Sequence, residues 1–151
     1  MKKDTALLLL RLAGLGLAVG HGWGKISALA IGEGDRFVAG VAALGFPLPA
    51  VFAWAAALAE FVGGLAVAIG LGSRISASFA AFTMFVAAFG RHHFHHHVLM
   101  ALGLYQATPD EVKKWGNPEM SLIYLLCFLA IILMGGGRFS LDPLFFNRKK
   151  K

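Results

Sequence analysis

The sequence predicts an all-α membrane protein, a bundle of four transmembrane helices with short interfacial helices in its outer loops. Two observations lead to this prediction: 58% of the 151 residues are hydrophobic and only 15% are charged, and the apolar residues form four long segments. A helix needs about 20 apolar residues to cross a membrane, so little chain is left for a soluble part. We therefore expect one integral membrane domain over residues 1–151, in contact with the lipid bilayer.

The expected helices follow from these apolar segments and from the residues that interrupt them. The transmembrane helices are predicted at about 5–30, 50–71, 75–100 and 118–135. Short helices are predicted at about 35–44 and 109–115, between the long ones. Pro49 and Pro118 suit helix starts, and Gly135 opens a glycine run that suits a helix end.

The basic residues predict the orientation. If both termini lie on one side, nine Lys and Arg residues fall on that side and five on the other. The positive-inside rule then places both termini in the cytoplasm. Topology and anionic lipid headgroups thus account for the net charge of +6, and no nucleic-acid partner is expected.

Polar residues form a stripe along the first transmembrane segment. Arg11, His21 and Lys25 recur at helical spacing within an otherwise apolar run. A charged side chain at the bilayer centre costs about 2.5–3.5 kcal/mol even by lenient scales, so the stripe should face protein or water. Glu60, deep in the second segment, is the expected acidic counterpart. We expect a Glu60–His21 contact, direct or through one water, with Lys25 completing a polar pocket.

A ligand pocket is the functional interpretation of this stripe. Its predicted residues are Arg11, His21, Lys25, Glu60 and Glu119. A quinone headgroup suits such a pocket, because its carbonyl oxygens accept hydrogen bonds from His or Lys and a carboxylate relays protons. The alternatives are an ion-pair network that only holds two helices in register, and proton or ion conduction.

A run of histidines ends the third segment. His92 and His96, like His93 and His97, are four residues apart, which on a helix places two imidazoles on one face. Imidazole pairs of this kind bind Zn, Ni or Cu, so these four residues are a candidate metal site. An accidental polyhistidine tract is the alternative. Heme is not expected, because no heme-binding motif accompanies the histidines.

The remaining polar features are structural in our interpretation. Arg138 and Asp142 are four residues apart and of opposite charge, which predicts a local ion pair at the cytoplasmic surface. Cys127 is the only cysteine, which excludes an intramolecular disulfide and a CxxC redox pair. Redox activity would therefore need a cofactor.

Several motifs, taken together in this order, resemble the DoxX family. They are Arg11, His21-Gly22-Trp23-Gly24-Lys25, Phe46-Pro47, Glu60 with Gly63-Gly64, Gly70-Leu71 with Arg74, Glu119, and Gly137 to Asp142. The resemblance extends over nearly the whole chain and implies a four-helix protein of a bacterial or archaeal cytoplasmic membrane. Some members resemble subunits of quinol oxidase or thiosulfate:quinone oxidoreductase assemblies. The histidine run departs from the family pattern.

The resemblance and the polar stripe together predict a function. We expect a membrane subunit of a redox system that interacts with quinone or is accessory to an oxidoreductase. Its partners would be other subunits of that system or further copies of the chain. The alternative is a non-catalytic scaffold, or a protein that handles metal or small solutes through its histidine run.

Overall fold

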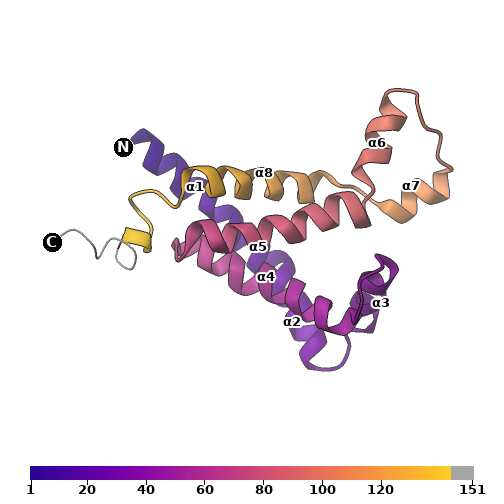
Figure 1. Cartoon of the computed structure of the whole chain (residues 1–151), viewed down its shortest axis with the longest axis horizontal. Coiled ribbons are helices and arrows are strands. Elements are labelled where there is room, and N and C mark those ends of the chain that lie inside the picture. Colours follow the sequence, from indigo (N-terminus) through magenta and orange to yellow (C-terminus); the bar gives the residue numbers. More distant parts are fainter. Residues whose placement is uncertain (144–151) are drawn as a thin grey trace.

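A computed structural model describes residues 1–143, and these residues form helices and no strands. Long helices lie side by side, and short helices spread from one end of them (Figure 1). The elements in chain order are α1 (Lys2–Leu17), the π-helical η1 (Ala18–Gly22), α2 (Trp23–Ala30), α3 (Asp35–Ala43), α4 (Pro49–Ile69), α5 (Ser73–Phe85), the π-helical η2 (Val86–Arg91), α6 (Phe94–Ala101), α7 (Pro109–Trp115) and α8 (Glu119–Met134).

Three helical stretches are long and apolar enough to cross a membrane. They are Lys2–Ala30, Pro49–Ile69 and Ser73–Arg91. The 16-residue α8 is long and apolar enough to cross a membrane only when it is counted together with α7, and the two helices are bent by 41° relative to each other. The all-helical fold class is thus confirmed, whereas the fourth crossing and the interfacial position of the short helices stay predictions.

The long helices pack in a chain of neighbours. α4 packs against α1 and η1 on one side and against α5 on the other, and α5 packs against α8. The buried cluster between them includes Leu17, Val67 and Phe128. Outside it, large apolar side chains stay uncovered, such as Leu133 at 78% exposure. An uncovered apolar surface of this extent suits lipid and not water.

Glycines let the first and second long helices approach closely. A Cβ atom added at Gly14 would lie 2.5 Å from the carbonyl oxygen of Gly64, and one at Gly22 would lie 2.6 Å from the backbone nitrogen of Phe61. Small residues allow this kind of backbone contact between membrane helices. The close approach brings the residues that follow Gly22 alongside the middle of α4.

The helix predicted over 75–100 is interrupted, so the prediction of one continuous helix there is wrong. η2 ends at Arg91 and α6 begins at Phe94. Between them, His93 has a left-handed backbone with φ 49°. This conformation is uncommon outside glycine, although histidine is enriched in it. Apolar periodicity does not reveal such a break, because the residues on both sides of it remain helical.

Candidate ligand cavity

A cavity of about 870 Å³ lies beside the second half of the first long helix. Its walls come from η1, α2, α3, α4, α5 and η2. Most of its lining is apolar and includes the rings of Phe37, Phe46, Phe52, Phe79 and Phe82. The polar side chains that line it are His21, Lys25, Glu33, Arg36, Glu60, Thr83, Arg91 and His92. The cavity is therefore amphipathic, with charged groups at defined positions in an aromatic shell.

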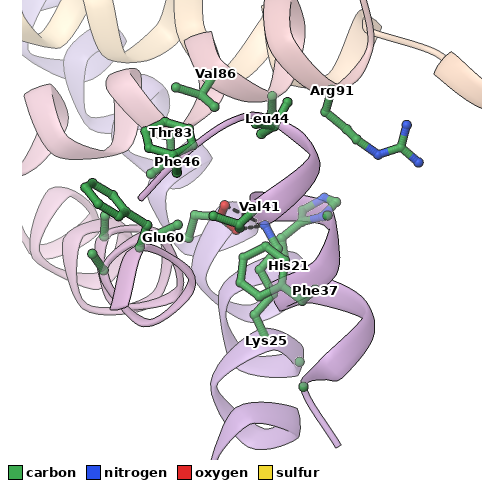
Figure 2. Close-up of a pocket in the computed structure, with 18 of the residues that line it drawn as sticks. His21, Lys25, Phe37, Val41, Leu44, Phe46, Glu60, Thr83, Val86 and Arg91 are labelled. Carbon is green, nitrogen blue, oxygen red and sulfur yellow. Dashed lines mark hydrogen bonds and ion pairs between the residues drawn. The ribbon is translucent and has the colours of Figure 1, made fainter. Parts of the chain in front are cut away.

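An ion pair stands in the wall of this cavity. The Nζ atom of Lys25 lies 2.5 Å from Oε1 and 2.7 Å from Oε2 of Glu60, and Figure 2 shows both contacts as dashed lines. The Glu60 side chain is only 3% exposed and that of Lys25 is 30% exposed. The ammonium also lies 5.0 Å from the centre of the Phe37 ring, within cation–π range. The Glu60 side chain is thus deeply buried, while the Lys25 side chain is only partly buried.

Lys25 takes the place that we predicted for His21. Depth along the helix favoured His21, which is nearer to the level of Glu60, but the long lysine stem spans the extra distance. His21 lines the same cavity and stacks edge-on against Tyr124, with the ring centres 6.0 Å apart. The predicted Glu60–His21 contact is therefore replaced by Glu60–Lys25, and His21 lies on the cavity wall.

Both π-helical segments line the cavity. η1 supplies His21, and η2 supplies Val86, Ala87 and Arg91. A π-helical turn contains one residue more than an α-turn allows and is frequent at functional sites. Neither segment could be found from a 3.6-residue pattern. The sequence analysis also did not identify the cavity residues of α5, which are Phe79, Phe82 and Thr83.

Hydrogen bonds join the rim of the cavity to α7. The guanidinium of Arg91 donates to the carbonyl oxygen of Lys114 at 2.8 Å, so it points away from Glu60 (Figure 2). The Nδ1 atom of His92 lies 2.7 Å from the carbonyl oxygen of Trp115. The end of η2 is therefore held by the segment that leads into α8.

Two predicted pocket residues lie elsewhere. Arg11 is 2% exposed and donates to the carbonyl oxygens of Gly136 at 3.3 Å and Phe139 at 2.8 Å. At 1.5 Å per residue, Arg11 and Lys25 are about 21 Å apart along the helix, too far for one pocket. Glu119 is exposed and is not part of the cavity lining. Including both in the pocket was wrong.

The predicted Arg138–Asp142 pair is also absent from the described residues. The backbone N–H of Ser73 donates to the Asp142 carboxylate at 3.1 Å, while the Arg138 side chain is exposed and its backbone N–H donates to Asp4 at 3.1 Å. Residues 138–141 form turns and bends before Asp142, so the four-residue spacing does not place the two side chains together. The tail closes the end of the bundle where Arg11 lies.

The histidine run is divided by the break before α6. His93, His95 and His96 each place a ring nitrogen within 4.8 Å of the others, whereas His92 lines the cavity and His97 packs against Trp115. The predicted pairs on one helical face are not present, because no single helix contains all four residues. Burial, followed by the charges of His96 and His95, lowers the pKa of His93 below its ordinary value. This favours the neutral imidazole that binds metals.

Comparison with known protein families gives one match. A family model described as DoxX matches residues 6–97, more than half of the chain, and this stretch includes every wall of the cavity. The tail from Gly137 to Asp142 lies outside the matched stretch. No curated protein and no solved structure matches the chain.

Proposed function

Because the chain belongs to the DoxX family of membrane proteins, which is often linked to redox or quinone-related systems, we propose that it binds a quinone headgroup in this cavity. It would do so as a membrane subunit of a redox system. The observation that supports this best is the Lys25–Glu60 pair in the wall of an otherwise aromatic cavity. Electrons would come from a partner subunit, and we do not propose catalysis by this chain alone.

The chemistry of a quinone fits the lining. The cavity volume of about 870 Å³ is within the usual range for small-molecule sites, roughly 300–1,000 Å³. Phenyl rings such as those of Phe37 and Phe82 suit the flat, apolar headgroup. Lys25 and His21 can donate to carbonyl oxygens that become more basic on reduction, while the buried carboxylate of Glu60 can hold or release a proton.

An ion pair that only holds helices in register is the competing explanation. Lys25 and Glu60 do connect the first and second long helices. Burying two charges costs desolvation energy, which a purely structural ion pair repays only with good geometry and further hydrogen bonds to both partners. Here the Lys25 side chain is 30% exposed and both residues line a cavity, which favours a role toward a ligand.

Quinone binding by the purified full-length protein tests the proposal. We expect a short-tailed quinone to bind in detergent micelles, with Glu60→Gln and Lys25→Gln weakening it by about 10-fold or more, the loss of one hydrogen bond to a charged group. Glu119→Gln is the matched control, because the same change falls on an exposed carboxylate outside the cavity. If Glu60→Gln and Glu119→Gln bind quinone as the unmodified protein does, the pair has only a structural role.

A further inference from the structure

The chain bends sharply at a histidine between η2 and α6. His93 has φ 49° and ψ 45°, a left-handed conformation that a non-glycine residue keeps only where its surroundings hold it. Such strained residues cluster at ligand sites and switch regions. The bend places the His93 ring against the first turn of α6.

Three imidazoles meet at this bend. The His93 ring centre is 5.4 Å from that of His96, with the planes 6° apart, and 5.9 Å from that of His95. One nitrogen from each ring lies within 4.8 Å of the other two. Nitrogens around a tetrahedral zinc ion, at about 2.0–2.1 Å from the metal, are about 3.3 Å apart. We expect rotation of the imidazole side chains to bring the nitrogens to this spacing when an ion binds.

Aromatic side chains enclose the cluster. The Trp115 ring centre lies 5.3 Å from that of His93 and 5.0 Å from that of His96, and Tyr105 stacks on His96 at 4.7 Å. The Nδ1 atom of His96, like the Nε2 atom of His97 outside the cluster, is shielded from solvent and has no hydrogen-bond partner within residues 1–143. Because buried polar atoms are nearly always paired, the His96 nitrogen calls for a partner. A bound ion would supply one.

We propose that His93, His95 and His96 form a mononuclear site for a late first-row divalent ion such as Zn²⁺, with the fourth position open to water. Imidazole nitrogens suit Zn, Ni and Cu, and exposed His95 gives the ion a route of entry. None of the three residues lines the cavity, so the site is separate from the proposed quinone site. A bound ion would fix the bend that leads from the cavity rim into α6.

Zinc titration of the purified full-length protein, carrying an affinity tag without histidine, tests the site. Calorimetry should show one ion per chain. His93→Gln, His95→Gln and His96→Gln should each weaken binding by more than the roughly 10–100-fold that is lost when a hydrogen-bond partner of a ligand is changed. His97→Gln is the matched control, since it lies in the same run but outside the cluster, and should keep the original affinity.

His95→Gln is the deciding variant. His95 is exposed, so its substitution spares the packing even if His93→Gln or His96→Gln fails to fold. If His95→Gln keeps the original affinity while His92→Gln or His97→Gln lowers it, pairs four residues apart hold the ion and the proposal is wrong. If no single substitution lowers the affinity, the run binds as interchangeable histidines, and the proposal is wrong for that reason.

Discussion

Separating the Lys25–Glu60 pair should cost more than removing both partners. Lys25→Met leaves a carboxylate that is 3% exposed without its cation. Breaking a fully buried pair costs about 3–5 kcal/mol. Because the Lys25 side chain is 30% exposed, the pair is only partly buried and we expect about 1–3 kcal/mol here. Glu60→Leu should cost less, because a freed lysine can extend toward water.

A double-mutant cycle measures the coupling between the two side chains. The free energy of unfolding is obtained by titrating the protein with sodium dodecyl sulfate in mixed micelles and following helical circular dichroism. Lys25→Met/Glu60→Leu should be more stable than the sum of the two single changes predicts, by about 1 kcal/mol or more. Lys113→Met, on the exposed face of α7, is the control and should leave stability unchanged. Additive single effects would show that the two groups do not stabilise each other.

The remaining predictions concern packing, the closed end of the bundle and topology. Gly22→Ala should destabilise the protein by about 1–3 kcal/mol through overpacking against α4. Gly20→Ala, in the same π-helical segment, should not, because a Cβ atom added there has no neighbour within 4 Å. Equal unfolding midpoints of the two variants would contradict the close approach of the helices. Arg11→Leu should cost about 1–3 kcal/mol, because two carbonyl oxygens lose their donor, yet leave quinone binding intact; binding assays on the purified variant check this. In a cysteine-free background, a cysteine at Thr108 should react with an impermeant thiol reagent added to whole cells and one at Lys3 should not; the reverse result would invert the orientation.

The sequence predicted the helices that form the cavity better than the contacts within it. Composition and apolar length were enough for the all-helical class. We paired Glu60 with the first helix because an uncompensated charge inside the membrane is costly. That helix does supply the partner of Glu60, which is Lys25. The choice of His21 over Lys25 was wrong because it compared depths along an ideal helix. That comparison did not allow for the length of the lysine side chain or for the π-helical turn that ends between His21 and Lys25.

The other errors come from assuming a helix where the backbone turns. The spacing His92–His96 has its predicted meaning only on a continuous helix, and the left-handed residue His93 ends that continuity. Residues 138–141 likewise form turns and bends, so Asp142 contacts Ser73 instead of Arg138. A single sequence contains no periodic signal for either turn, because both depend on contacts with distant segments.

The hydrogen bonds of Arg11 have a consequence for biosynthesis. Its two carbonyl partners are made 125 and 128 residues later in the chain. At about 5–20 residues per second, the first helix exists for roughly 6–25 s before they leave the ribosome. During that time its guanidinium has to stay near water or in contact with the insertion machinery. We therefore expect the first helix to reach its final depth only after Gly136 and Phe139 have been synthesised, and a nascent chain stopped before Gly136 to be a substrate for membrane quality control.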